Sequence, residues 1–263
     1  MSTHRPRKRF GQNFLHDAGV IRRIVECIRP TTGQTLVEIG PGRGALTAPL
    51  LEQLVHLDVI EIDRDLVAGL RAAYPSGRLC VHEADALKFD FTALSAERGA
   101  ALRLVGNLPY NISTPLLFHV LTQAGAIDDM HFMLQKEVVQ RMAAAAGGKD
   151  YGRLSVMLAW RCRVQALFDI APGAFTPAPQ VTSSLVRLIP HATPPFEVGD
   201  PGVFRDLVTR AFTQRRKTLR NALGKQVPAE TLEELGIDPG LRPQMLSPSD
   251  FAAIARALST PAS

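Results

Sequence analysis

The chain has 263 residues, 46% of them hydrophobic, which is enough to bury the core of one α/β domain and of a smaller second domain. Its formal net charge of +5 favours polyanionic partners but does not identify one. The basic N-terminus is not followed by an apolar segment, and no apolar run approaches the roughly 18 residues of a membrane span. We therefore expect a cytoplasmic protein that does not contact membranes.

The first predicted element is a helix over Val20–Ile28, where apolar residues recur at helical spacing until Pro30 to Gly33 break the pattern. Short apolar runs then alternate with helical stretches. The runs that we predict as strands are Thr35–Ile39, Leu57–Ile60, Leu79–Val81, Leu102–Val105 and His131–Leu134. Such alternation is typical of βαβ units and a parallel sheet.

The pattern changes after Val164, where two strand-like runs flank a proline-rich loop without a helical pattern, which predicts an antiparallel hairpin closing the sheet. These runs are Val164–Ile170 and Thr182–Ile189, and the helical patterns that follow are Val203–Gly224, Ala229–Leu235 and Pro248–Leu258. We predict an α/β domain with a Rossmann-like, mostly parallel sheet over residues 1–194 and a small all-helical domain over 195–263.

Two groups of basic residues suggest two surfaces that contact phosphates, although a solvated tail and an ordinary charged helix face are the alternatives. The groups are Arg5, Arg7, Lys8 and Arg9, and Arg215, Arg216, Lys217, Arg220 and Lys225. The three cysteines, Cys27, Cys80 and Cys162, lie far apart without the pairing of a zinc or iron–sulfur site. We predict no bound metal.

A glycine-rich turn, Gly40-Pro41-Gly42-Arg43-Gly44, follows the first predicted strand of the sheet and opens a helix. Glycine lets a backbone approach a ligand closely and tolerates positive φ, although the same pattern also occurs in simple tight turns. Pro41 removes a backbone N–H that would cradle a pyrophosphate, and the spacing is GxGxG rather than GxGxxG. The turn therefore favours a nucleoside cofactor without phosphates.

Two acidic residues follow the next two strands. Glu61 stands where a carboxylate accepts both ribose hydroxyls, and Asp85 stands where a carboxylate accepts from an adenine amino group while the next backbone N–H, from Ala86, donates to the ring. The alternative for Glu61 is a surface acid beside Asp63 and Arg64.

The fourth strand ends in Asn107-Leu108-Pro109-Tyr110, and Thr114 is predicted to cap a helix that starts at Pro115. The Asn107 side-chain oxygen and the Leu108 carbonyl offer two acceptors for an exocyclic adenine amine, with Tyr110 free to stack on the base. Catalysis there would be orientation and electrostatics rather than base chemistry. A turn rich in turn-forming residues is the alternative.

Together these motifs resemble the ribosomal RNA adenine dimethyltransferase family, and within it the bacterial small-subunit branch linked to kasugamycin sensitivity. The resemblance extends almost end to end. The matching segments are Arg9–Leu15, the glycine turn, Asn107–Tyr110, Leu134–Val138, Phe175–Ser183 and Gln214–Asn221. One departure is Gln180, where many relatives carry a lysine, so the resemblance does not imply a phosphate contact at this position.

The resemblance implies a class I methyltransferase that uses S-adenosylmethionine and releases S-adenosylhomocysteine. It implies that Asn13 and Leu15 close over the methionine part of the cofactor, and that Phe175 sandwiches the base opposite Tyr110, where a core phenylalanine is the alternative. The implied cofactor contacts are Asn13, Leu15, Gly40, Gly42, Glu61, Ile62, Asp85, Ala86 and Asn107. The implied catalytic residues are Asn107, Leu108, Pro109, Tyr110 and Phe175, and the RNA contacts are Arg7, Lys8, Arg9, Arg215, Arg216, Lys217 and Arg220.

The leading hypothesis is a monomeric enzyme that dimethylates two neighbouring adenosines in a hairpin loop near the end of small-subunit ribosomal RNA, on an immature subunit. The alternatives are a large-subunit methyltransferase of the macrolide-resistance type, a ribosome-assembly or transcription factor without turnover, and a DNA adenine methyltransferase. A nicotinamide oxidoreductase is disfavoured by Pro41 and by the lack of an evident acid for hydride transfer.

Overall fold

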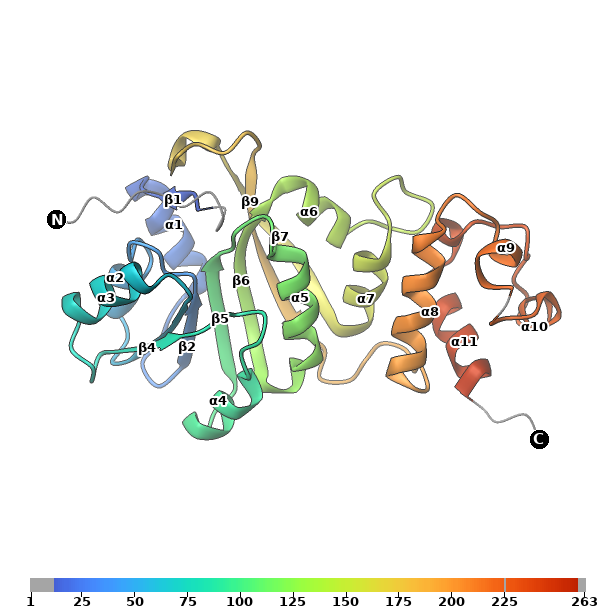
Figure 1. The fold of residues 1–263 in the computed structure, drawn as a ribbon, viewed down its shortest axis with the longest axis horizontal. Helices are drawn as coiled ribbons and strands as arrows, with labels where there is room; N and C mark the ends of the chain where they lie inside the picture. The colour runs from blue at the N-terminus through green and yellow to red at the C-terminus, as the bar shows by residue number, and fades with distance from the viewer. Residues whose placement is uncertain (1–11, 225, 260–263) are drawn as a thin grey trace. The chain divides into compact units, whose positions relative to one another are not determined.

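The structure is a computed structural model that describes residues 12–224 and 226–259. In this part of the chain, seven strands form one sheet in the order β4-β3-β2-β5-β6-β9-β7. Figure 1 labels all of these strands except β3. The pairs β3/β4, β2/β3, β2/β5 and β5/β6 are parallel, and β9 runs antiparallel to β6. The predicted mostly parallel α/β sheet is thereby confirmed.

The strands of this sheet are β2 (Thr35–Ile39), β3 (Leu57–Glu61), β4 (Leu79–Glu83), β5 (Leu102–Asn107), β6 (Ile127–Gln135), β7 (Cys162–Ile170) and β9 (Ser183–Pro190). A second, two-stranded sheet pairs β1 (Phe14–Leu15) with β8 (Phe175–Thr176). The helices in the first part of the chain are α1 (Ala18–Ile28), α2 (Thr47–Leu51), α3 (Arg64–Ala73), α4 (Phe91–Arg98) and α5 (Ser113–Thr122), with the 3-10 helix η2 (Ala124–Ala126).

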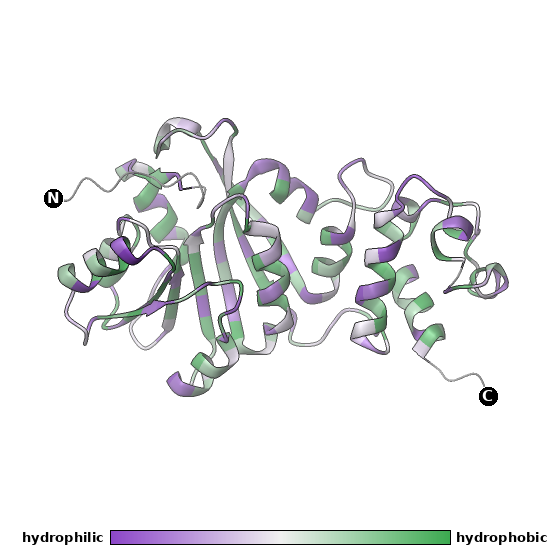
Figure 2. Cartoon of the chain, viewed as in Figure 1, coloured by the Kyte–Doolittle hydropathy of each residue, from purple (hydrophilic) through white to green (hydrophobic). Residues whose placement is uncertain are grey.

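The central strands are buried, as their near-continuous apolar sequences predict for a parallel sheet covered on both faces. Figure 2 shows hydrophobic residues along these strands, interrupted by polar positions. Two of the buried polar residues form a network with the half-buried Arg187, in which the Arg103 guanidinium donates to both Asp129 oxygens at 2.8 and 3.1 Å and Arg187 donates to one of them. Arg103 also donates to the Ile28 carbonyl, so it joins helix α1 to the sheet.

The helices of this part begin at side-chain caps. Asp17 accepts from the Val20 N–H, Asp63 from Asp65, and Asp90 from Ala93. The predicted cap at Thr114 is wrong, because α5 begins at Ser113 and its N-cap residue, Ile112, makes no side-chain cap bond. Thr114 and Pro115 therefore both lie inside the first turn, where the missing N–H of a proline removes no helical hydrogen bond.

The β7 and β9 strands are neighbours in the sheet, as expected of the predicted hairpin. Their connection differs from a plain loop, because it contains the 3-10 helix η3 (Pro172–Ala174) and strand β8. It also binds the N-terminal segment, since Phe14 pairs with Thr176 and the His16 N–H donates to the Ala174 carbonyl at 3.0 Å. This connection is therefore fixed to a segment that lies far earlier in the chain.

The chain divides into two compact units, residues 1–139 with 165–190, and residues 140–164 with 191–263. The second unit contains α7 (Arg153–Arg161), α8 (Pro201–Thr213), α9 (Leu219–Leu223), α10 (Ala229–Glu234), η4 (Pro243–Met245) and α11 (Pro248–Ser259), while α6 (Lys136–Met142) and β7 each have residues in both units. This division differs from the expected boundary at residue 195, because α7 packs on the C-terminal helices through the Trp160 and Phe204 rings, 5.4 Å apart.

The helix predicted over Val203–Gly224 is interrupted, since α8 ends at Thr213 and α9 starts at Leu219. Thr218 is extended, and the N–H groups of Leu219 and Arg220 donate to the Leu241 and Pro239 carbonyls instead of to the preceding helical turn. These bonds compete with helix continuation, which the hydropathy pattern cannot reveal. No helix among the described residues is long and apolar enough to cross a membrane.

Candidate active site

The glycine turn after β2 adopts the conformation that its glycines predict. Gly40, Gly42 and Gly44 have φ values of 66°, 57° and 82°, in the left-handed region that other residues rarely adopt. The Gly40 N–H donates to the Ile60 carbonyl at 2.9 Å, which holds the turn against the end of β3. The backbone thus lines a hollow at the carboxyl ends of the strands, where parallel sheets bind ligands.

Glu61 lies at the end of β3 and is only 6% exposed, so the alternative of a surface acid is wrong. Its Oε1 accepts from the N–H groups of Ile62 and Asp63, both at 2.9 Å, and its Oε2 accepts from Gly42 at 3.3 Å. Burial raises the pKa of Glu61, and the backbone bonds oppose that rise. The carboxylate is thus fixed against the glycine turn.

Asp85 follows β4 and is half-buried. Its Oδ1 accepts from the Leu87 N–H at 3.0 Å, which orients the carboxylate by a short local turn. Ala86, the next residue, lines the same hollow as Asp85 and Glu61. The two acids therefore stand on adjacent strands, as their sequence positions predict.

Asn107 is the last residue of β5, and its side chain is held from the N-terminal segment. The Nδ2 amide donates to the Asn13 carbonyl at 2.7 Å. Because that bond fixes the amide nitrogen, the side-chain oxygen remains the acceptor of the group. The preceding residue, Gly106, must be a glycine, since a Cβ there would collide with the Ile39 carbonyl oxygen. The close approach of β5 to β2 at this point brings Asn107 beside the glycine turn.

Leu108 to Tyr110 continue from Asn107 into the turn before α5. The Leu108 N–H donates to the Met133 carbonyl at 3.3 Å, and the Ser113 hydroxyl donates to the Tyr110 carbonyl at 3.1 Å. The hydroxyls of Tyr110 and Ser183 share a hydrogen bond of 2.6 Å, and burial raises the pKa of Tyr110. The tetrapeptide is thus fixed at its start, its middle and its end.

One cavity of about 230 Å³ joins these residues. The sequence-predicted residues that line it are Asn13, Leu15, Gly40, Gly42, Glu61, Ile62, Asp85, Ala86, Asn107, Leu108, Pro109 and Tyr110. They come from widely separated stretches of the chain, yet the fold brings them to one edge of the sheet.

Phe175 is the predicted catalytic residue that the structure does not bring to the cavity. It is 2% exposed and belongs to the hydrophobic core, where it pairs with Leu15 across the β1/β8 sheet. This arrangement corresponds to the core phenylalanine that was the alternative to a base-stacking role. A ring in this position has no surface available for a substrate base.

Sequence reasoning missed several cavity residues, of which Glu38 is the most unusual. It is buried within β2, and its Oε2 accepts from the Thr47 hydroxyl at 2.6 Å. Burial raises the pKa of Glu38 to about 7, opposed by the Thr47 bond and reinforced by Glu61. The signal in the sequence was a lone acid inside an apolar strand. Phe14 was also missed; the Arg43 guanidinium lies 4.6 Å from its ring centroid.

The basic residues proposed to contact RNA differ in their surroundings. Arg215 is half-buried and donates to the Gln244 side chain at 3.1 Å and to the Lys149 carbonyl at 2.5 Å, whereas Arg216, Lys217 and Arg220 are exposed. Gln180 is also exposed. Arg5, Arg7, Lys8, Arg9 and Lys225 lie outside the described residues.

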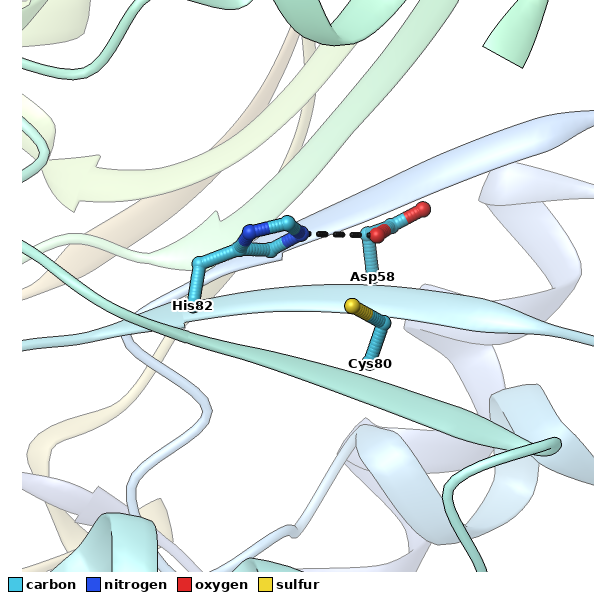
Figure 3. Close-up of side chains that lie close together, drawn as sticks. All are labelled: Asp58, Cys80 and His82. Atoms are coloured by element: carbon cyan, nitrogen blue, oxygen red, sulfur yellow. Dashed lines mark hydrogen bonds and ion pairs between the residues drawn. The ribbon is translucent and has the colours of Figure 1, made fainter. Parts of the chain in front are cut away.

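A second cluster of polar side chains, Asp58, Cys80 and His82, lies on β3 and β4 away from the cavity (Figure 3). One atom of each lies within 4.8 Å of the others, which is the arrangement of a candidate metal site. However, the Arg98 guanidinium donates to both Asp58 oxygens, at 2.7 and 3.0 Å, and His82 bonds one of them at 2.8 Å. A cation would be repelled by that guanidinium, so we interpret the cluster as a buried ion pair.

The sheet and its cavity define a Rossmann-like methyltransferase, and comparison with solved structures supports this class. A dimethyladenosine transferase from Plasmodium falciparum superposes with a TM-score of 0.74 and 26% identity, covering 92% of this chain and 95% of that one. The 23S rRNA methyltransferase ErmE superposes with a TM-score of 0.68 and 25% identity, covering 94% and 100%.

The chain belongs to the ribosomal RNA adenine dimethylase family, which matches residues 3–259. Its curated relatives include the ribosomal RNA small subunit methyltransferase A of Alcanivorax borkumensis, 55% identical over 100% of this chain and 93% of the relative. The protein of the same name from Aromatoleum aromaticum is 57% identical over 97% of this chain and 94% of its own length. The family resemblance predicted from the motifs is confirmed.

Proposed function

We propose that this protein transfers methyl groups from S-adenosylmethionine to the exocyclic amines of two adjacent adenosines in small-subunit ribosomal RNA, in a hairpin loop near its 3′ end. The observation that carries the proposal is the amide of Asn107, whose nitrogen is held by the Asn13 carbonyl so that its oxygen remains an acceptor at the cavity. Full-length relatives of 55–57% identity are named as small-subunit ribosomal RNA methyltransferases.

The cavity suits a nucleoside cofactor because of its donors and acceptors. Glu61 offers a fixed carboxylate for ribose hydroxyls, and Asp85 offers a second carboxylate for an adenine amine. Pro41 in the glycine turn supplies no N–H for a phosphate, and the lining also holds the acid Glu38 and only Arg43 as a cation among the described residues. When bound, S-adenosylmethionine supplies an electrophilic methyl carbon on a sulfonium centre.

The residues at the end of β5 act by orientation. An exocyclic adenine nitrogen is a weak nucleophile because its lone pair is delocalised into the ring. The Asn107 side-chain oxygen and the Leu108 carbonyl accept its two hydrogens, which directs the lone pair away from them and toward the cofactor side of the cavity. Pro109 restricts the backbone that aims the Leu108 carbonyl. No strong base is needed, since the amine proton becomes acidic only as the new bond to nitrogen forms.

The remaining assignments concern the substrate. Tyr110 stacks on the target base, while Arg216, Lys217 and Arg220 contact phosphates of the immature small subunit, to which the chain binds as a monomer in the cytoplasm. Because its side chain is already bonded to Gln244 and Lys149, Arg215 contributes less to phosphate binding than its exposed neighbours.

The central test is Asn107→Ala, assayed with labelled S-adenosylmethionine on undermethylated small subunits. We expect transfer to fall by at least about 100-fold, because the amine loses an acceptor present in the reacting geometry, while the thermal unfolding midpoint changes little. Asn221→Ala on the exposed side of α9 is the matched control and keeps most of the activity. Wild-type rates in Asn107→Ala would overturn the mechanism.

Mapping of the modified nucleotides distinguishes the proposal from its rivals. Label in two adjacent adenosines near the 3′ end of small-subunit RNA supports it. Label only in naked large-subunit RNA would instead favour the macrolide-resistance type, and label in DNA a DNA adenine methyltransferase. Binding to immature subunits without any transfer by the wild-type protein would favour an assembly factor.

A further inference from the structure

Ser183, the first residue of β9, is fully buried at 0% exposure, and its hydroxyl shares the 2.6 Å hydrogen bond with the hydroxyl of Tyr110. Tyr110 itself is half-buried and lines the cavity. A phenol that is bonded at its tip to a buried side chain cannot rotate out of the cavity without losing that bond. The position of the Tyr110 ring is therefore fixed by a contact with β9 as well as by the turn that contains Tyr110.

The connection that precedes Ser183 also reaches Asn107, by a second route. Strand β8 in that connection pairs with β1, and the residue before β1, Asn13, accepts from the Asn107 amide. The connection between β7 and β9 thus holds Asn107 through Asn13, and the strand into which it leads holds Tyr110 through Ser183. The acceptor and the stacking ring lie at opposite ends of one tetrapeptide, so their relative placement depends on both bonds.

We propose that Ser183 is a positioning residue for methyl transfer: its hydroxyl holds the Tyr110 ring in the plane in which that ring stacks on the target adenine. The inference rests on the proposed function, which supplies the adenine substrate. It assigns no direct contact between Ser183 and the reacting atoms. Its effect is transmitted through the Tyr110 hydroxyl.

The second methyl transfer depends on this positioning more than the first. Each transfer replaces one hydrogen of the amine by a methyl group, and the displaced proton leaves to solvent. After the first transfer, the amine has one hydrogen left for the two acceptors, Asn107 and Leu108. Stacking on Tyr110 must then supply a larger share of the orientation. Loss of the Ser183 hydroxyl therefore causes monomethylated adenosine to accumulate.

The chain contains a matched control in the next residue. Ser184 is also buried, and its hydroxyl also makes a 2.6 Å bond, but to Asp169, which is paired with Lys136. Successive side chains of a strand point to opposite faces, so Ser184 is directed away from Tyr110. Ser184→Ala removes an equivalent hydroxyl from the same strand without touching the cavity.

The experiment compares Ser183→Ala, Ser184→Ala, Tyr110→Phe and the double variant Ser183→Ala/Tyr110→Phe on undermethylated small subunits, with mono- and dimethyladenosine measured over time. We expect Ser183→Ala to slow the second transfer about 3- to 10-fold relative to the first, since one net hydrogen bond is lost. Ser184→Ala keeps the wild-type ratio. Tyr110→Phe removes the other hydroxyl of the same hydrogen bond. In the double variant, the second transfer should be slowed no more than in the more affected single variant.

Calorimetry with S-adenosylhomocysteine accompanies each variant, and unchanged affinity shows that the cofactor site is intact. A wild-type product ratio in both Ser183→Ala and Tyr110→Phe would overturn the inference while leaving the proposed function standing. Equal effects of Ser183→Ala and Ser184→Ala on the ratio would also overturn it, because they would indicate a general packing role. Absence of transfer by the wild-type protein would refute the proposed function itself, and the inference with it.

Discussion

Strand β3 carries two buried carboxylates with opposite surroundings. Asp58, near its start, is paired with the Arg98 guanidinium, which donates to both of its oxygens, and with the His82 ring, which bonds one of them. Glu61, at its end, accepts from the N–H groups of Gly42, Ile62 and Asp63 at the edge of a cavity. Burial acts on both, yet the pKa of Asp58 is well below its usual range and the pKa of Glu61 is above it.

The difference shows how burial alone fails to identify a functional acid. A carboxylate that is neutralised by a guanidinium is satisfied, and its removal should cost stability. A carboxylate supported by backbone dipoles and left at a cavity gains further from ligand hydroxyl groups, so its removal should cost binding. Substitutions at the two positions should therefore separate stability from ligand affinity.

The largest effect is expected at Asp58. Asp58→Asn leaves the Arg98 guanidinium and the His82 ring without their anion, which should lower the free energy of unfolding by about 4 kcal/mol. Urea denaturation measures this loss, and Asp128→Asn, at an exposed position of β6, is the control. The affinity for S-adenosylhomocysteine should stay unchanged in the folded protein. If Asp58→Asn lost affinity for S-adenosylhomocysteine without losing stability, the proposed contrast between Asp58 and Glu61 would be wrong.

The pH dependence at Asp58 has a defined sign. Because the folded pKa of Asp58 lies below the unfolded value of 3.8, its stabilisation is complete above that value and is lost as the pH falls through the folded pKa. The wild-type protein should therefore lose the stabilisation from ionised Asp58 only in strong acid. The Asp58→Asn variant lacks this stabilisation at every pH. The two unfolding curves should converge as the pH is lowered, and parallel curves would contradict the assignment.

Substitution of Glu38 tests whether ionisation of a buried cavity carboxyl that is not paired with a guanidinium destabilises the fold. Its pKa rises from 4.5 to about 7 because of burial, so between these values the folded state holds a proton that the unfolded state has lost. Raising the pH through that window should therefore lower the wild-type free energy of unfolding by about 3 kcal/mol, which is the shift converted at 1.36 kcal/mol per unit.

The Glu38→Gln variant cannot ionise and should be spared this loss. Its stability relative to wild type should rise between about pH 4.5 and about pH 8 when measured by urea denaturation. Glu52→Gln, at an exposed position after α2, is the control and should show a constant difference from wild type. A constant difference for Glu38→Gln as well would mean that the buried carboxyl does not titrate in this window.

Apolar runs predicted the strands of the sheet but not their full lengths. Strand β6 begins at Ile127 rather than at His131, because Asp129 lies buried in the strand and is paired with Arg103 and Arg187. A hydropathy pattern reads that aspartate as a break, since its partners are distant in sequence. Strand β5 similarly continues through Asn107, whose side chain faces the cavity instead of the core.

Local motifs and the family resemblance predicted 12 of the 26 residues that line the cavity, and long-range contacts account for part of what they missed. The glycine turn and the Asn107 tetrapeptide each follow a strand end, so parallel topology alone brings them together. Phe175 was placed at the site by resemblance, but its burial depends on pairing with the N-terminal segment. The bond between Tyr110 and Ser183 joins two segments through the folded sheet, and no sequence period indicates it.

The smallest of these effects is expected at Glu61, the carboxylate of β3 that we expect to contribute to ligand binding rather than to stability. In Glu61→Gln, the amide retains one acceptor for the N–H groups of Ile62 and Asp63 but presents a donor toward Gly42 and the cavity. We expect the Kd for S-adenosylhomocysteine to rise about 30-fold, or about 2 kcal/mol, because under the proposed function two ribose hydroxyls would lose a charged acceptor. Stability should change by less than about 1 kcal/mol, since a neutral amide is cheaper to bury.

Glu83→Gln gives this test a matched control. Glu83 lies opposite Glu61 in the register of β3 and β4, but its side chain is partly exposed and paired with Arg64. Calorimetry should therefore find wild-type affinity in Glu83→Gln and weakened affinity in Glu61→Gln. If Glu61→Gln bound the cofactor normally and instead unfolded at lower urea, the two carboxylates of β3 would be structural alike. The cavity would then need a different ribose acceptor, for which the neighbouring buried Glu38 is the remaining lining carboxylate on β2.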